Sequence, residues 1–94
     1  MENNPRMEFR LSRHAEEEMV RRQISRQLVE SVLENPEQRL AEPGGKQIFQ
    51  SRYRSEDGRM YLLRAIVNML REPAVVVTLY RTSKIDKYWS QNES

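Results

Sequence analysis

The pentapeptide Tyr80-Arg81-Thr82-Ser83-Lys84 places five hydrogen-bond donors in a row directly after a strongly apolar stretch. The guanidinium of Arg81 is a planar fork that fits a phosphate, and Lys84 offers a point charge. Thr82 or Ser83 could cap a following helical turn, whose free amides would also favour an anion. Two interpretations remain open: an anion-binding site, or a strand that ends in a capped turn with solvated cations.

His14 is the only histidine, and it follows Ser12, a good residue to cap the start of a helix. The positive end of a helix disfavours an imidazolium, so the ring would stay neutral and able to accept a proton. The functional interpretation is a general base or acid. The alternative is a surface histidine beside a helix cap.

Three arginines, Arg52, Arg54 and Arg64, come from neighbouring strands of one predicted hairpin. Arg64 alternates with apolar residues, so it points out of an otherwise apolar face. It either pairs with an acid, such as Glu56 or Asp57, or contacts an anion. Arg52 is a weaker candidate for the same phosphate contact.

Aromatic residues accompany these cations. Tyr53, Tyr61, Tyr88 and Trp89 could stack on nucleobases, although Trp89 also suits the clasp of a C-terminal tail. One histidine and no cysteine argue against a zinc site. We therefore expect neither a metal nor another cofactor.

Size and composition indicate one small globular domain. The 94 residues are 37% hydrophobic and 32% charged, and there is no cysteine for disulfides. The chain contains no apolar run long enough to span a membrane, and its start, MENNPRMEFR, lacks the apolar centre of a signal peptide. We expect a cytoplasmic protein with no membrane partner.

The net charge of +2 is unevenly distributed. Residues 1–45 carry 7 basic and 9 acidic groups, whereas residues 46–94 carry 9 basic and 5 acidic groups. This asymmetry favours an anionic partner for the second half. The total is nevertheless far from the strongly basic balance of many nucleic-acid-binding proteins.

Hydrophobic periodicity predicts two helices and then strands. The first helix should face inward with Ala15, Met19 and either Val20 or the stem of Arg22. The elements expected in chain order are a short strand or lead-in at 7–11, helices at 13–22 and 26–34, strands at 38–42, 46–54, 59–67 and 74–80, and a helical turn within 83–89. Residues 1–6 and 91–94 should be disordered, and residues 7–90 should form the single domain.

This order predicts an α+β fold with two N-terminal helices packed on a roughly four-stranded antiparallel sheet. The central strands, 59–67 and 74–80, are apolar on both faces. Two short helices can cover only one face, so the other needs the C-terminal tail, a second copy or a partner.

The segments LSRHAEEEMVRRQIS, LENP, the basic hairpin and VVVTLYRTSKIDKYW resemble a family of small bacterial proteins catalogued mainly as a domain of unknown function. That family is grouped with RelE-like toxins, in the broader set that includes barnase, colicin and EndoU-type ribonucleases. The resemblance covers about residues 8–89. It implies the fold described above and metal-independent RNA cleavage, often by a toxin that an antitoxin neutralises.

The resemblance also implies roles for the candidate residues. His14 would be the base or acid, Arg64 and Arg81 would hold the phosphate, and Lys84 or Tyr80 would stabilise charge or donate a proton. RNA contacts would come from Arg52, Tyr53, Arg54, Thr82 and Ser83. The low net charge favours free mRNA or tRNA over a ribosome-docked substrate. A non-catalytic RNA- or protein-binding module, or a homodimer joined through the second apolar face, remains an alternative.

Overall fold

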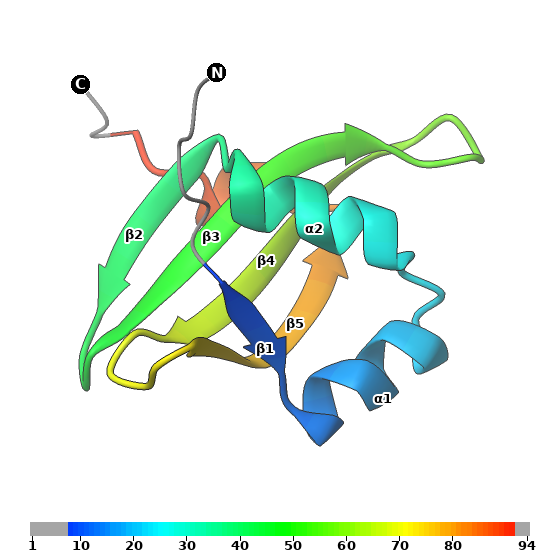
Figure 1. Ribbon diagram of the computed structural model, residues 1–94. Coiled ribbons are helices and arrows are strands. Elements are labelled where there is room, and N and C mark those ends of the chain that lie inside the picture. The colour runs from blue at the N-terminus through cyan, green and yellow to red at the C-terminus, as the bar shows by residue number, and fades with distance from the viewer. Residues whose placement is uncertain (1–7, 92–94) are drawn as a thin grey trace, which may run out of the picture.

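The computed structural model describes residues 8–91 (Figure 1). Disorder predicted for residues 1–6 and 91–94 lies outside the described residues except at Gln91. The elements are β1 (Phe9–Leu11), α1 (Arg13–Arg21), α2 (Arg26–Glu34), β2 (Gln38–Glu42), β3 (Lys46–Arg54), β4 (Met60–Asn68), β5 (Ala74–Thr82) and α3 (Ile85–Tyr88). Among the described residues, no helix is both long enough and apolar enough to cross a membrane.

The α+β class is confirmed, but the sheet has five strands and is mixed. Its strand order is β1-β5-β4-β3-β2. Strands β2 to β5 form the predicted antiparallel meander, whereas β1 pairs with β5 in parallel, with Phe9 opposite Ala74. The roughly four-stranded antiparallel sheet that the sequence predicted corresponds to β2 to β5, and β1 adds a fifth strand in parallel. Three residues are too few for periodicity to reveal a partner so distant in the chain.

Ser12 fixes the start of α1 and ties it to the sheet. Its hydroxyl accepts a hydrogen bond from Ala15 N (2.9 Å) and donates one to Val77 O (2.8 Å). Its own backbone N–H donates to Val76 O at 3.0 Å. Ser12 therefore acts both as the predicted helix cap and as a link between α1 and β5.

Replacing Ser12 by alanine should destabilise the fold by about 1–2 kcal/mol, because the helix loses its cap and the Val77 carbonyl loses a donor. The free energy of unfolding in urea measures this. Ser25 caps α2 by accepting only from Leu28 N (3.1 Å) at an exposed position, so Ser25→Ala should cost less. Equal losses would show that the bond to Val77 contributes nothing.

The inward face of α1 differs in one respect from the prediction. Ala15 and Met19 are buried as expected, but Val20 is 80% exposed and Glu18 is buried. Arg21 and Arg22 both donate to the carboxylate of Glu18, and the Arg22 Nε to Glu18 Oε1 distance is 2.8 Å. The hydrogen bond from Arg22, and next that from Arg21, lowers the pKa of Glu18 below its ordinary 4.5.

The depressed pKa of Glu18 makes stability depend on pH. Its contribution is present above the ordinary glutamate pKa of 4.5 and is lost as the pH falls through the lower pKa of the folded state. Glu18→Gln should therefore lower Tm near neutral pH and flatten the fall in Tm on acidification. Glu17→Gln is the matched control, because Glu17 forms only an exposed pair with Arg13. Identical pH profiles for the two variants would contradict this assignment.

One face of the sheet carries the main core. Helices α1 and α2 cover it with apolar side chains that pack on strands β3, β4 and β5, and the central members are Ala15, Met19, Val29, Val32, Phe49, Leu63, Ala65, Val67, Val76 and Leu79. The edge of the Phe9 ring meets Phe49 with centroids 5.6 Å apart. The short strand β1 thus closes this core at one side.

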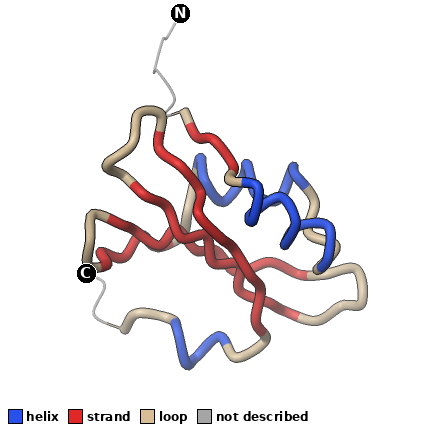
Figure 2. Tube along the Cα trace, turned by 90° about the horizontal axis from the view of Figure 1, so that it is seen from below, coloured by secondary structure: helices blue, strands red, loops and turns tan. Residues whose placement is uncertain are grey.

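The C-terminal segment covers the opposite face. Figure 2 shows α3 on the other side of the sheet from the two longer helices. The sequence left three options for covering the second apolar face: the C-terminal tail, a second copy or a partner. In the structure the tail covers it. The sheet consequently separates two surfaces, and every strand residue belongs to one or the other.

Candidate functional site

The alternation of β5 places the predicted phosphate residues on opposite faces of the sheet. Arg81 pairs in register with Leu63, a residue of the helix-covered core, whereas Tyr80 pairs with Arg64. Successive side chains of a strand point to opposite faces. Arg81 therefore lies on the helix face, and Arg64 and Tyr80 lie on the face covered by the C-terminal segment.

His14 lies apart from Arg81. It is exposed in the first turn of α1, two residues after Ser12, which is bonded to Val76 and Val77 of β5. Arg81 is four residues farther along β5 than Val77, which corresponds to about 13 Å of strand. The structure does not bring His14, Arg64 and Arg81 into one catalytic centre.

Arg64 belongs to a row of polar side chains that crosses four strands, consisting of Gln38, Gln50, Arg64 and Tyr80; we call it the polar row. Gln50 Nε2 donates to Gln38 Oε1 (2.8 Å), Arg64 Nε donates to Gln50 Oε1 (2.8 Å), and Arg64 Nη1 donates to the Tyr80 hydroxyl (2.7 Å). Arg64 is 8% exposed and Gln50 is 0% exposed.

The polar row supplies the hydrogen-bond partners of Arg64. Arg64 does not pair with Glu56 or Asp57, because those residues lie in the hairpin loop whereas Arg64 lies in mid-strand, opposite Gln50. Its guanidinium is held by two neutral oxygens and lies 4.3 Å from the ring centroid of Tyr88. Arg64 and Tyr80 thus have a clear part in holding this face together.

Arg52 lies on the same face as the polar row. Its Nε and backbone N–H both donate to Glu37 Oε1, at 3.0 and 2.8 Å, and its guanidinium lies 4.1 Å from the ring centroid of Trp89. The side-chain hydrogen bond from Arg52 is the main cause that lowers the pKa of Glu37. Glu37 therefore occupies the hydrogen-bonding edge of the Arg52 guanidinium, and the Trp89 ring occupies one of its faces.

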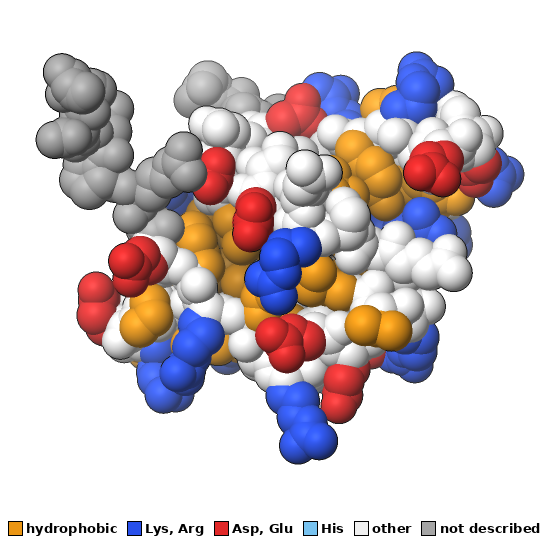
Figure 3. All heavy atoms as spheres, turned by 45° about the vertical axis from the view of Figure 1, so that its right-hand side comes forward, with side chains coloured by type: hydrophobic (Ala, Val, Ile, Leu, Met, Phe, Trp, Pro, Cys, Tyr) orange, Lys and Arg blue, Asp and Glu red, His pale blue; other side chains and the backbone are white. Residues whose placement is uncertain are grey.

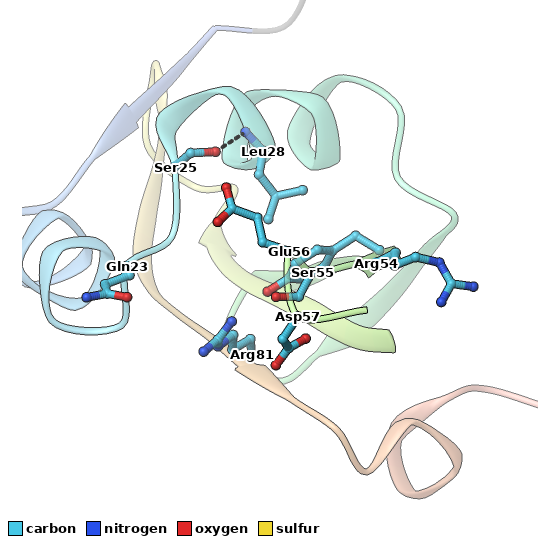
Figure 4. Close-up of a pocket in the computed structure, with 9 residues that line it drawn as sticks. Gln23, Ser25, Leu28, Arg54, Ser55, Glu56, Asp57 and Arg81 are labelled. Carbon is cyan, nitrogen blue, oxygen red and sulfur yellow. Dashed lines mark hydrogen bonds between the residues drawn. The ribbon is translucent and has the colours of Figure 1, made fainter. Parts of the chain in front are cut away.

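An open pocket lies at the other surface, where the end of β5 meets the loop before α2 and the β3–β4 hairpin. We call it the Arg81 pocket, and its volume is about 690 Å³. Its lining residues are Gln23, Ser25, Leu28, Tyr53, Arg54, Ser55, Glu56, Asp57 and Arg81 (Figure 4). Of the ten residues predicted from the sequence, Arg81, Tyr53 and Arg54 meet here.

Two tyrosines hold the guanidinium of Arg81. It lies 4.5 Å from the ring centroid of Tyr61. A hydrogen bond with Tyr53 is the largest cause that raises the pKa of Arg81, and Asp57 contributes through its charge. Tyr53 and Tyr61 are themselves cross-strand partners with ring centroids 6.0 Å apart. Arg81 is therefore a cation that lies over the ring of Tyr61 and next to Tyr53.

Two carboxylates, those of Asp57 and Glu56, also line the pocket, and they differ in their hydrogen bonds and direction. Asp57 Oδ1 accepts a hydrogen bond from Arg59 N (2.9 Å), and this bond is the main cause that lowers the pKa of Asp57. Glu56 instead extends toward Ser25 and Leu28 in Figure 4, while Arg54 points away from the other labelled side chains. From the sequence, Glu56 and Asp57 were considered only as partners of Arg64, since Asp-Gly marked a turn.

The rest of the donor row lies where β5 ends. The Thr82 hydroxyl accepts a hydrogen bond from Lys84 N at 3.0 Å. The helix-capping position before α3 is Lys84, without a side-chain capping bond, so the predicted capping of this helical turn by Thr82 or Ser83 was wrong. Ser83 and Lys84 are exposed and line a shallow hollow with Asp86 and Lys87.

Charges of both signs are mixed over the surface. Figure 3 shows basic and acidic side chains interspersed on the viewed face, with apolar side chains between them. Within residues 8–91, no group of three or more histidine, cysteine, aspartate or glutamate side chains is arranged to hold a metal ion. The Arg81 pocket is therefore distinguished by Arg81 and the two tyrosines that contact it, and not by a broad basic surface.

Comparison with known proteins gives one match. A family model described as "Domain of unknown function (DUF4258)" matches residues 11–81, and the chain belongs to this family. No curated protein and no solved structure matches the chain. The matched region contains α1, α2 and β2 to β4, and it ends at Arg81, before α3 begins.

Proposed function

We propose that this family member binds single-stranded RNA in the Arg81 pocket and cleaves it without a metal ion. The observation that carries the proposal is the guanidinium of Arg81, which Tyr53 and Tyr61 hold at an open pocket. Proteins bind unpaired nucleotides with the same two kinds of group, since cations contact the phosphate and aromatic rings stack on the bases. The resemblance to RelE-like ribonucleases supports the same activity.

The proposed chemistry uses the ribose itself as nucleophile. A base removes the proton from the 2′-hydroxyl, and the 2′-oxygen attacks the adjacent phosphorus while the bond to the 5′-oxygen breaks. The leaving oxygen takes up a proton, so the products are a 2′,3′-cyclic phosphate and a 5′-hydroxyl. Arg81 would stabilise the charge that develops on the phosphoryl oxygens, and this kind of stabilisation is often the largest catalytic effect.

Within this proposal, Glu56 is the better general base. It lines the same pocket as Arg81, whereas His14 lies at the far end of α1. The carboxylate of Asp57 is engaged by the backbone of Arg59, and its lowered pKa makes it a weaker base. We therefore assign proton abstraction to Glu56 in place of His14.

A second candidate function is RNA binding without cleavage. The separation of His14, Arg64 and Arg81 favours it, because three of the groups first expected to act together are dispersed. The two carboxylates in the Arg81 pocket also weaken its attraction for a phosphate. This module would use Arg81 and the tyrosines for affinity alone.

One set of assays separates the two functions. The purified protein is incubated with single-stranded RNA in excess chelator, and its affinity is measured on the 2′-O-methyl form of that RNA, which lacks the nucleophile. Cleavage that Glu56→Gln removes and His14→Ala spares supports the enzyme. Salt-dependent binding without cleavage supports the module. Cleavage that requires His14 and not Glu56 would contradict the assignment of the base.

A toxin role is a further part of the proposal and rests on the resemblance. Expression of the protein in a bacterial host should then arrest growth, and expression of the Arg81→Gln variant should not. Growth curves at matched protein levels measure this effect. Equal growth with both proteins would remove the toxin role while leaving RNA binding and cleavage in solution to the preceding assays.

A further inference from the structure

Residues 83–91, which we call the strap, lie on the polar row and are held through their main chain. Gln38 pairs with both polar groups of one strap residue, since Ser90 N donates to Gln38 Oε1 and Gln38 Nε2 donates to Ser90 O, each at 3.0 Å. Gln50 Nε2 also donates to Tyr88 O at 3.2 Å. Two strand side chains thus recognise the backbone of the strap.

The side chains of the strap add two ring contacts. Tyr88 covers the guanidinium of Arg64 with a centroid distance of 4.3 Å, and Trp89 covers that of Arg52 at 4.1 Å. Tyr88 also meets the ring of Tyr80 edge to face, with centroids 6.3 Å apart. The face therefore has two adjacent subsites for aromatic side chains, in which the ring packs on the guanidinium of Arg64 or Arg52.

The strap is attached as a ligand would be. None of the residues of α3 is buried, and the polar groups that hold it belong to strands that lie inside the matched family region, whereas residues 83–91 lie beyond it. Trp89 has the extended backbone of a bound peptide, with φ −75° and ψ 129°. The strap thus covers this face of the sheet through specific subsites, although none of the residues of α3 is itself buried.

We propose that the polar row and Arg52 form a peptide-recognition site, and that the strap is its ligand bound within the same chain. The site accepts a helical turn that continues into an extended segment, with two successive aromatic residues where they meet, and it takes the same segment from a second copy of the chain once its own strap is displaced. Main-chain pairing by Gln38 favours a peptide over a nucleic acid, because it matches the N–H and C=O of one residue.

Trp89 is the only tryptophan, so the full-length variant Tyr88→Ala/Trp89→Ala has none, and it loses both ring contacts of its strap. A peptide of residues 83–91 then supplies the only tryptophan signal. We expect its emission to shift to the blue and to saturate as the variant is added. Adding Gln38→Ala to the variant should weaken peptide binding about tenfold, because two hydrogen bonds are lost.

A scrambled peptide of the same composition should not bind. No saturable shift with the folded variant would overturn the proposal, and so would binding of single-stranded RNA to this face in place of the peptide. Hydrogen exchange on the wild-type protein tests whether the strap detaches, even if the variant does not fold. The amides of Trp89 and Ser90 should exchange much faster than those of β4; equal protection would show that the strap does not detach.

Discussion

Replacing Arg81 by glutamine should lower RNA cleavage by about 10²–10³-fold, the usual cost of removing one group that stabilises transition-state charge. Glutamine keeps a polar side chain of moderate length but loses the cation and its contact with Tyr61. The affinity for 2′-O-methyl RNA should also fall, and the dependence of binding on salt should become shallower by about one counterion. Single-turnover cleavage and binding titrations at several salt concentrations measure the two effects.

Arg54→Gln is the matched control for this change. Arg54 lines the same pocket, but its guanidinium points away from it and donates to Gly58 O at 2.8 Å. Arg54→Gln removes a cation from the same rim but leaves Arg81 in place, so it should change cleavage little. If both variants lost activity equally, net charge and not the fixed guanidinium of Arg81 would be responsible. The thermal unfolding of both variants shows whether either change is a loss of folding.

Replacing Gln50 by leucine should destabilise the fold by about 2–4 kcal/mol. Gln50 is completely buried, and its side chain bonds Gln38, Arg64 and the carbonyl of Tyr88. Leucine leaves the buried Nε–H of Arg64 without an acceptor, and an unsatisfied group that carries charge costs more than a neutral one. Urea unfolding measures the loss. Gln47→Leu is the control on the same strand, where the amide bonds only the exposed Arg39, and it should cost less than about 0.5 kcal/mol.

The double variant Gln50→Leu/Arg64→Leu tests the reason for this loss. Removing the cation together with its acceptor leaves no unpaired charge in the sheet, so part of the stability should return. The double variant should therefore be more stable than the sum of the single effects predicts. Strictly additive losses would show that Gln50 contributes by packing alone and that its bond to Arg64 is unimportant.

Local signals in the sequence predicted most of the fold. Ser12 caps α1 as expected, and Ser25 caps α2 in the same way, because their short side chains reach the first free amides. The predicted bounds of α2, β2 and β3 agree with the structure, since a proline, a Pro-Gly-Gly turn and an Asp-Gly turn separate these elements. The parallel pairing of β1 with β5 could not be predicted, because nothing local in Phe9–Leu11 specifies a partner beyond residue 70.

The candidate site was harder to predict than the fold. Arg81 and Tyr53 were both selected from the sequence, and both line the pocket, but the sequence did not show that Tyr80 and Arg81 must separate to opposite faces of the sheet. Tyr80 and Arg81 separate because β5 continues past Tyr80 to Thr82. The predicted strand ended at residue 80, so it did not assign Arg81 to a face of the sheet. Glu56 was also missed, because a carboxylate in a hairpin loop carries no signal of its own.

The central claim is that RNA binds in the Arg81 pocket. The most direct test is a backbone NMR titration of the protein with 2′-O-methyl RNA in chelator. The account predicts that the largest shift changes fall at Gln23, Ser25, Tyr53, Asp57 and Arg81. Changes confined to the strap and the polar row, or no changes at RNA concentrations that saturate other single-strand binders, would contradict it.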